Sequence, residues 1–169
     1  MANSLSSSLL LSLPTCIVCD RAIYSPIDGL DRIEITTSLA GFGTDYVLSG
    51  TDNAVKVMNI DKKAMELSAL SAADYATKVE EWKRDLANQI LSDPGSIVAY
   101  YIINKYIGDE PLFNPVNDFD FKIIGAVTNA FNSFHPNDPR TTYMVDRLRQ
   151  GLAARRSATA PSDNRFIAE

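Results

Sequence analysis

Residues 111–148 read PLFNPVNDFDFKIIGAVTNAFNSFHPNDPRTTYMVDRL, and this stretch, inside the longer range 93–156, decides the fold. Each of its halves begins near a proline and then places apolar residues three and four positions apart, the spacing of one helix face. The break between them, HPNDP at 135–139, combines residues that end one helix and start another. The stretch therefore predicts a helix, a turn and a second helix, and it contains no recognisable catalytic group.

The first of these helices is expected over residues 118–134 and the second from Pro139. The apolar residues expected to face inward are Phe119, Ile123, Ile124, Val127, Phe131 and Phe134 in the first helix, and Met144, Leu148 and Leu152 in the second. His135, the only histidine of the chain, stands in the helix-ending turn before a proline. Because no cysteine or carboxylate accompanies it in sequence, it is interpreted as a polar turn residue and not as a catalytic base.

Two further helices are predicted before this stretch. The first is capped by Thr51 or Asp52 and the second by Ser71, with Asp74 in a capping-box-like position. Their apolar stripes are Ala54, Val57, Ile60, Ala64 and Leu67 in the first, and Tyr75, Val79, Trp82, Leu86 and Ile90 in the second. Opposite the second stripe lies a charged face that we expect to be solvated, formed by Lys78, Glu80, Glu81, Lys83 and Arg84. At helical spacing, Trp82 is interpreted as a core residue rather than as a ligand-stacking residue.

A helix is also expected from the Asp93-Pro94 entry to Gly108, because proline is tolerated in the first turn of a helix. Residues 97–107, IVAYYIINKYI, are apolar almost all round, which fits either a central helix or a buried strand, and the flanking signals favour the helix. The Asp93-Pro94 and Asp138-Pro139 entries lie 45 residues apart. This spacing is similar to that of helical-hairpin repeats.

The first fifty residues have the composition of β-strands. A turn signal at 25–29, SPIDG, precedes alternating polar and apolar residues at 31–37, and a second short strand is expected at 45–50. The predicted fold class is therefore α+β and mostly α. A short N-terminal antiparallel β segment (1–50), the candidate remnant of a small β-domain, precedes a helical domain of about five helices (51–156), arranged as a helical-hairpin array, and then a linker or tail (157–169).

The composition is that of an ordinary globular protein, with 46% hydrophobic and 22% charged residues among 169. The net charge of −5 argues against a nucleic-acid partner, because phosphate binding requires concentrated Lys and Arg. The one basic cluster, Arg147, Arg149, Arg155 and Arg156, is expected in the last turns of a helix, where cations complement the helix dipole.

No apolar run is long enough to span a membrane, but the N-terminus has two interpretations. Leu13-Pro14-Thr15-Cys16 is similar to the end of a bacterial lipoprotein signal, which makes Cys16 a candidate lipid anchor. However, no Lys or Arg precedes Arg21 and the apolar run is short. The alternative is a β-strand that places Leu9, Leu11 and Leu13 on one face.

Cys16 and Cys19 form a C-x-x-C, whose redox use requires a lowered thiol pKa. Because Ile17 and Val18 favour a strand, where positions three apart face opposite sides, we interpret both as structural thiols. No histidine or second C-x-x-C is near enough to suggest a metal site. We therefore assign no catalytic, cofactor-binding or metal-binding residue, and predict no cofactor. Three tyrosines, Tyr100, Tyr101 and Tyr106, are candidates to line a small-ligand crevice, with core packing as the alternative.

A set of local motifs resembles a known family. The motifs are DRIEITTS at 31–38, FGTDYVLSGT at 42–51, DPGS at 93–96, PLFNP at 111–115 and AFNSFHP at 130–136. They resemble the helical region of TlpA/ResA-like thiol:disulfide oxidoreductase lipoproteins of Bacteroidetes, over residues 31–156. In that family a small β-domain of unknown function and a helical segment precede a C-terminal thioredoxin-fold domain.

The resemblance implies an accessory module in the cell envelope, in the periplasm or anchored to the outer membrane. Its partner would be a thioredoxin-like domain in the same or another chain. Such a domain would begin beyond Glu169, so a fragment or a stand-alone remnant is expected. Cys16 and Cys19 lack the flanking Trp of the family's catalytic motif, so that role is not transferred to them. The leading prediction is a non-catalytic module. The alternatives are a thiol oxidoreductase that uses Cys16 and Cys19, and small-ligand binding in the crevice between the β segment and the helices.

Overall fold

The computed structural model describes residues 15–18, 21–24 and 32–159, and these ranges are mostly helical with short strands before the helices. This is the predicted α+β, mostly α, class. The strands are β1 (Thr15–Val18), β2 (Arg21–Tyr24), β3 (Glu34–Thr37), β4 (Tyr46–Ser49), β5 (Tyr106–Ile107) and β6 (Glu110–Pro111). The helices are α1 (Asp52–Ser68), α2 (Ala72–Ser92), α3 (Ile97–Ile103), α4 (Asp118–Phe134) and α5 (Pro139–Thr159).

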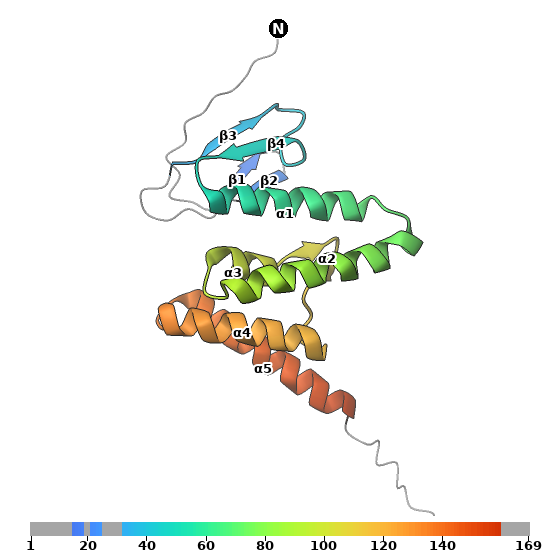
Figure 1. The fold of residues 1–169 in the computed structure, drawn as a ribbon, viewed down its shortest axis with the longest axis vertical. Coiled ribbons are helices and arrows are strands. Elements are labelled where there is room, and N and C mark those ends of the chain that lie inside the picture. The colour runs from blue at the N-terminus through green and yellow to red at the C-terminus, as the bar shows by residue number, and fades with distance from the viewer. Residues whose placement is uncertain (1–14, 19–20, 25–31, 160–169) are drawn as a thin grey trace, which may run out of the picture.

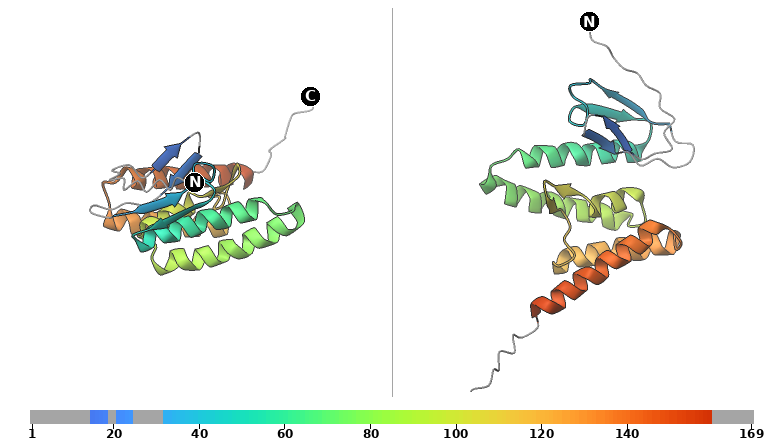
Figure 2. Two further views of the ribbon diagram at one scale, coloured as in Figure 1. Left: turned by 90° about the horizontal axis from the view of Figure 1, so that it is seen from above. Right: turned by 180° about the vertical axis from the view of Figure 1, so that it is seen from behind.

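The elements are stacked in layers in the order of the chain (Figure 1). The two N-terminal hairpins lie on one side of α1, and α2 and α3 lie on its other side, followed by the layer of α4 and α5. The right-hand panel of Figure 2 shows the same order from behind, with α5 in front of α4. The predicted helical bundle behind a short antiparallel β segment is thus confirmed.

Each strand pairs with the strand next to it in sequence. In β1–β2, Cys16 lies opposite Ile23, and in β3–β4, Ile35 lies opposite Leu48. A two-stranded hairpin is marginally stable by itself, so each must pack against a helix. The buried side chains of β4 are Tyr46 and Leu48, which alternate with exposed neighbours as a half-buried strand requires.

Helix α1 separates two hydrophobic cores. Its Ala54 and Met58 pack toward the N-terminal hairpins, in a small core that also contains Ile23, Phe42, Tyr46 and Leu48. The predicted stripe residues Val57, Ile60, Ala64 and Leu67 are buried in a larger core shared with α2, α3, α4 and α5. Because both faces of α1 are used, this helix joins the β segment to the helical domain.

The predicted helix starts are confirmed for α1 and α2. The Thr51 hydroxyl accepts a hydrogen bond from the Ala54 N–H at 3.2 Å, and the Ser71 hydroxyl accepts one from the Asp74 N–H at 3.4 Å. Gly50, immediately before the first cap, has φ +117°, and a Cβ there would overlap the carbonyl oxygen of Arg32. The passage from β4 into α1 therefore requires glycine at this position.

The helix predicted from the Asp93-Pro94 entry to Gly108 is shorter at both ends in the structure. Helix α3 is capped by Ser96, whose hydroxyl accepts from the Ala99 N–H at 3.1 Å, so Pro94 precedes the helix instead of opening it. The helix stops at Ile103, and residues 106–107 form β5, which turns back through Gly108 (φ +60°) to pair with β6. The apolar run could not show this change from helix to strand, because a buried helix and a buried strand can both be apolar throughout.

Several expected orientations also differ from the structure. Phe119 and Phe134 of α4, expected to face inward, are 49% and 71% exposed. Leu152 of α5 is 36% exposed, and α5 continues to Thr159, past the point where a tail was expected. Lys83, placed on the solvated face of α2, is 7% exposed. Trp82 packs against the larger core but is only partly buried.

Candidate functional site

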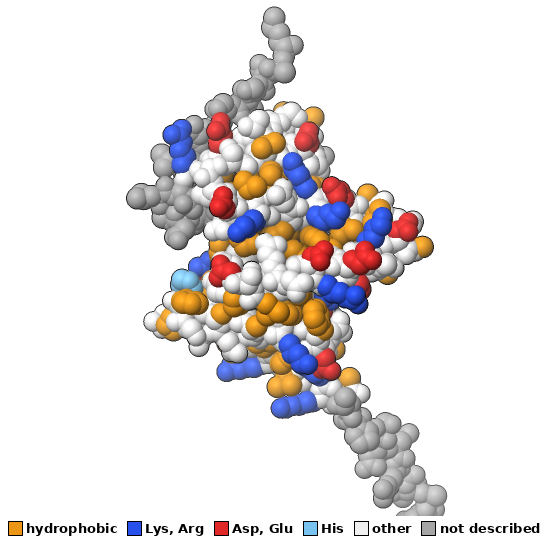
Figure 3. All heavy atoms as spheres, viewed as in Figure 1, with side chains coloured by type: hydrophobic (Ala, Val, Ile, Leu, Met, Phe, Trp, Pro, Cys, Tyr) orange, Lys and Arg blue, Asp and Glu red, His pale blue; other side chains and the backbone are white. Residues whose placement is uncertain are grey.

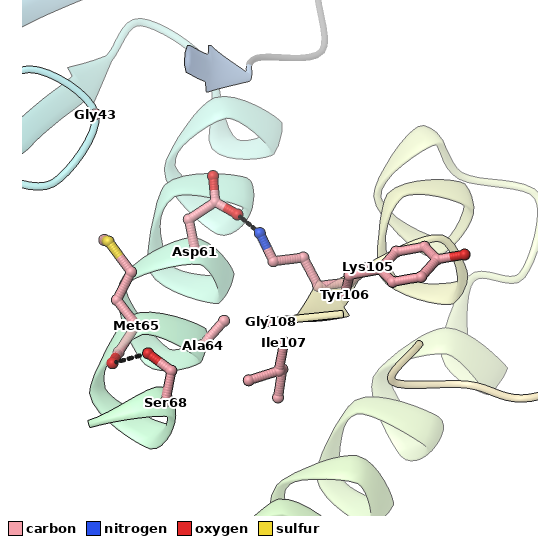
Figure 4. Close-up of a pocket in the computed structure, with 9 residues that line it drawn as sticks. All are labelled: Gly43, Asp61, Ala64, Met65, Ser68, Lys105, Tyr106, Ile107 and Gly108. Atoms are coloured by element: carbon pink, nitrogen blue, oxygen red, sulfur yellow. Dashed lines mark hydrogen bonds and ion pairs between the residues drawn. The ribbon is translucent and has the colours of Figure 1, made fainter. Parts of the chain in front are cut away.

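A cavity of about 200 Å³ lies between α1 and the start of the β5–β6 hairpin (Figure 4). Helix α1 and the segment around β5 supply most of its wall, and Gly43 of the loop before β4 closes one side. The lining residues are Gly43, Asp61, Ala64, Met65, Ser68, Lys105, Tyr106, Ile107 and Gly108. The sequence suggested a ligand site between the N-terminal β segment and the helices, but Gly43 is the one residue of that segment among the described residues that line this cavity.

Asp61 is the polar centre of this region. Its carboxylate accepts hydrogen bonds from the Tyr46 hydroxyl at 3.0 Å and from the Tyr101 hydroxyl, and it forms an ion pair with Lys105. The Lys105 ammonium also donates to the Tyr101 hydroxyl at 3.2 Å. Because the partners come from β4, α3 and the segment after α3, a single α1 side chain joins four parts of the chain.

The local sequence explains this convergence. Asp61 follows Ile60 in the buried stripe of α1, so its side chain lies at the edge of the core. Tyr101 lies in the last turn of α3 and Lys105 follows two residues after its end, and both side chains reach the Asp61 carboxylate. Burial, followed by the charge of Asp61, raises the pKa of Tyr46 far above its ordinary value. The tyrosine therefore remains a neutral donor to the carboxylate.

A second buried ion pair joins α2 to α4. The Lys83 ammonium lies 2.7 Å from the Asp120 Oδ2, and the two residues are 7% and 1% exposed. The same oxygen accepts the Asn114 N–H at 2.9 Å, which fixes the segment before α4. The ammonium also lies 5.5 Å from the centre of the Phe113 ring. Within the described residues, the other Asp120 oxygen is buried without a hydrogen-bond partner.

Arg147 anchors α5. Its guanidinium donates to the Ile103 carbonyl at 2.6 Å, to the Asn104 side-chain oxygen at 3.0 Å and to the Phe113 carbonyl. Burial lowers the pKa of Arg147 from its ordinary value. The sequence placed this arginine among the cations of the last turns, but it lies in the middle of α5 and binds the C-terminal end of α3.

The structure separates the three tyrosines that the sequence singled out. Tyr101 binds Asp61, and Tyr106 borders the cavity and is 53% exposed. Tyr100 instead packs against Phe131, with ring centres 5.7 Å apart. Only two of the three tyrosines are therefore close to the crevice.

The two cysteines and the histidine singled out in the sequence are the remaining residues to place. Cys16 lies in β1, as the β-branched neighbours predicted, whereas Cys19 lies outside the described residues. His135 ends α4, where its N–H donates to the Phe131 carbonyl at 2.7 Å. The ring centres of His135 and Phe131 are 4.9 Å apart.

Sequence reasoning missed all of the buried ionic residues. Asp61 and Lys83 each lie within one residue of an apolar stripe position, which was a weak signal for both. Asp120 is in the first turn of α4, where an acidic residue is already explained by the helix dipole. The partners of these residues are far away along the chain, and the sequence alone does not show which distant residues meet in the fold.

The described part of the chain contains no group of three or more His, Cys, Asp or Glu side chains arranged to hold a metal ion. None of its helices has both the length and the apolar composition needed to cross a bilayer. Comparisons with protein families, with curated proteins and with solved structures found no match to this chain.

Proposed function

We propose that this chain is a non-catalytic accessory module of a cell-envelope redox lipoprotein, which orients a thioredoxin-like domain or binds a partner. The observation that carries the proposal is the use of its buried ionisable groups. Lys83 and Asp120 bind each other, Arg147 binds a main-chain carbonyl at the end of α3, and none of the three lines the cavity. Such groups hold a scaffold together, whereas catalytic groups must also face a substrate.

The surface of the α4–α5 layer supports a role in binding. Figure 3 shows hydrophobic side chains along the lower half of the visible face, where this layer lies. The exposed large hydrophobic residues between the β5–β6 hairpin and the end of α5 are Val116, Phe119, Phe134, Tyr143 and Leu152. Aromatic residues are enriched at the centres of protein interfaces. A thioredoxin-like domain, in the same or another chain, is the partner that the sequence resemblance suggests for this surface.

The proposed location is the cell envelope, with Cys16 as a candidate lipid anchor. This part of the proposal depends on the Leu-Pro-Thr-Cys motif and on the resemblance to envelope lipoproteins. Radiolabelled palmitate incorporation in a Bacteroidetes host tests it. Label that is lost in Cys16→Ser supports the anchor, and label that remains in that variant contradicts it.

A titration tests the proposed binding role. The ¹⁵N-labelled chain is titrated with the thioredoxin-fold domain of a redox lipoprotein from the same genome. We expect chemical-shift changes concentrated on α4 and α5, and weaker binding by Phe134→Ser, whose side chain is 71% exposed. Glu66→Ser, on the exposed face of α1, is the control. No shift changes, or changes confined to α1, would contradict the proposal.

The cavity favours a second candidate function, the binding of a small ligand between α1 and β5. The supporting observation is that a charged pair, Asp61–Lys105, borders the same hollow as the apolar side chains of Ala64, Met65 and Ile107. A mixture of polar and apolar walls is typical of small-molecule sites. Chemical-shift mapping with a mixture of small organic probes tests whether this hollow is occupied in solution.

A further inference from the structure

The main chain of Tyr106 borders the cavity, because its ring points away from the hollow in Figure 4. Across the hairpin, Ile107 pairs with Glu110, and the Leu112 N–H donates to the Lys105 carbonyl at 2.9 Å. Hydrogen-bonded pairs alternate along antiparallel strands, so the N–H and C=O of Tyr106 point away from β6. The residue opposite Tyr106 is Pro111, which has no N–H to offer. The peptide groups of Tyr106 are thus directed to the open side of the hairpin.

Lys105 supplies a charged donor next to this main chain. Its ammonium donates to Asp61 and to the Tyr101 hydroxyl, and these two bonds use two of the three N–H groups of an ammonium. The Lys105 side chain is 19% exposed, so the remaining donor is within reach of solvent and of a ligand. Because Asp61 already neutralises the lysine, a bound anion would be held by this hydrogen bond more than by net charge.

Apart from Asp61 and Ser68, the rest of the wall is apolar and small. The methyl group of Ala64, the thioether of Met65 and the side chain of Ile107 line the hollow, whose volume is about 200 Å³. That is below the range of about 300–1,000 Å³ for drug-sized ligands. The space therefore suits one aliphatic side chain with the polar groups attached to it.

We propose that this cavity binds an aliphatic amino acid that carries a free α-carboxylate and an acylated nitrogen. Lys105 receives the carboxylate, the main chain of Tyr106 binds the amide, and Ala64, Met65 and Ile107 surround the side chain. A free carboxylate, an amide and an aliphatic side chain occur together at the C-terminus of a peptide and in a free N-acyl amino acid. The proposal rests on the ligand-binding candidate above and specifies its ligand.

The test is an ¹⁵N chemical-shift titration of the full chain with N-acetyl-leucine, with N-acetyl-leucinamide as the matched ligand without the carboxylate. We expect saturable shifts at Lys105, Tyr106 and Ile107 with the acid, and binding at least tenfold weaker with the amide. A tripeptide that ends in leucine separates the two sources. Tighter binding of the tripeptide indicates a peptide C-terminus, and equal binding indicates that one residue is sufficient. Equal binding of the acid and the amide would overturn the assignment of Lys105.

Matched variants on α1 locate the site. Met65→Trp places a large ring in the hollow, whereas Glu66→Trp adds the same ring at the exposed neighbouring position. We expect the first to abolish binding and the second to retain it, with unchanged circular dichroism in both. Binding that survives Met65→Trp would overturn the proposal.

A probe mixture of acetate, methylammonium and glycerol distinguishes a wrong ligand class from a cavity that binds no small ligand. If the mixture shifts the resonances of the cavity while N-acetyl-leucine does not, the ligand class is wrong and the ligand-binding candidate remains. If neither shifts them, both the class and the candidate fail.

Discussion

The Lys83 ammonium and the Asp120 carboxylate lie 2.7 Å apart in the interior, although the two residues are 37 positions apart in the chain. The pair fixes α2 against α4, and the Asn114 N–H joins it from the intervening segment. Replacing one member of a buried ion pair leaves an uncompensated charge, which is far more costly than the pair itself. The stability of the helical domain should therefore depend strongly on both partners.

Lys83→Met should lower the free energy of unfolding by about 3–5 kcal/mol, because Asp120 then remains charged and buried without its partner. The double variant Lys83→Met/Asp120→Leu should recover most of this loss, since no buried charge is left. Denaturant unfolding measured for both single variants and the double variant gives the coupling energy. The exposed Lys63, which pairs with Glu66, provides a control, and Lys63→Met should change stability by less than about 1 kcal/mol. Equal effects at the two lysines would contradict the role of the buried pair.

Arg147→Lys should destabilise the protein although it keeps the positive charge. A lysine cannot reach the Ile103 and Phe113 carbonyls and the Asn104 side chain together, as the guanidinium does. The expected loss is about 1.5–3 kcal/mol, the contribution of hydrogen bonds to a charged group. Arg149→Lys, at an exposed position two residues later, should leave the unfolding midpoint unchanged. If both variants behave alike, Arg147 does not anchor α5.

Two glycines with positive φ should respond very differently to alanine. At Gly108 a Cβ meets open space, so Gly108→Ala should cost only the strain of the left-handed conformation, about 1–2 kcal/mol. At Gly50 the added Cβ would overlap the Arg32 carbonyl, so Gly50→Ala should cost about 3 kcal/mol or more. Thermal unfolding of the two variants, compared with the wild type, measures the difference. A milder effect at Gly50 than at Gly108 would show that the β4–α1 junction is not held as described.

The burial of Tyr46 beside the Asp61 carboxylate leads us to expect a loss of stability at alkaline pH. The folded protein raises the pKa of Tyr46 above the ordinary value of 10.0, so the unfolded chain loses this proton first as the pH rises. The stabilisation should be fully present below about pH 10 and should decline above it. Urea unfolding between pH 8 and 11 is expected to show this decline in the wild type and a smaller one in Tyr46→Phe. Parallel pH profiles for the two proteins would exclude Tyr46 as the cause.

The fold could be predicted from the sequence wherever local signals and burial agree. The caps at Thr51 and Ser71 and the stripe Val57–Leu67 mark α1 and the start of α2, and all of them are confirmed. The prediction was right for residues 97–103 but failed at residues 104–107, because an apolar run fits a buried helix and a buried strand equally well. It also failed for Phe119 and Phe134, which lie near the two ends of α4. Helical periodicity shows which face of a helix is apolar, but not where along that face the neighbouring helices stop covering it.

The candidate site was predictable only in outline. The sequence suggested Tyr101 and Tyr106 as lining residues of a small-ligand crevice, but it placed that crevice at the N-terminal β segment and did not show the pairing of Asp61 with Lys105. That ion pair spans 44 positions and depends on how α1 meets the end of α3. Tertiary packing of this kind leaves no periodic trace in the sequence.

The claim that this chain supports chemistry carried out elsewhere is tested most directly by its own thiol-disulfide activity. The measurement is the rate of insulin reduction by the purified full chain with dithiothreitol, compared with Cys16→Ser and with a reaction without protein. We predict the same rate in all three reactions. Turnover above the protein-free rate that Cys16→Ser abolishes would contradict the account and make the chain a thiol oxidoreductase.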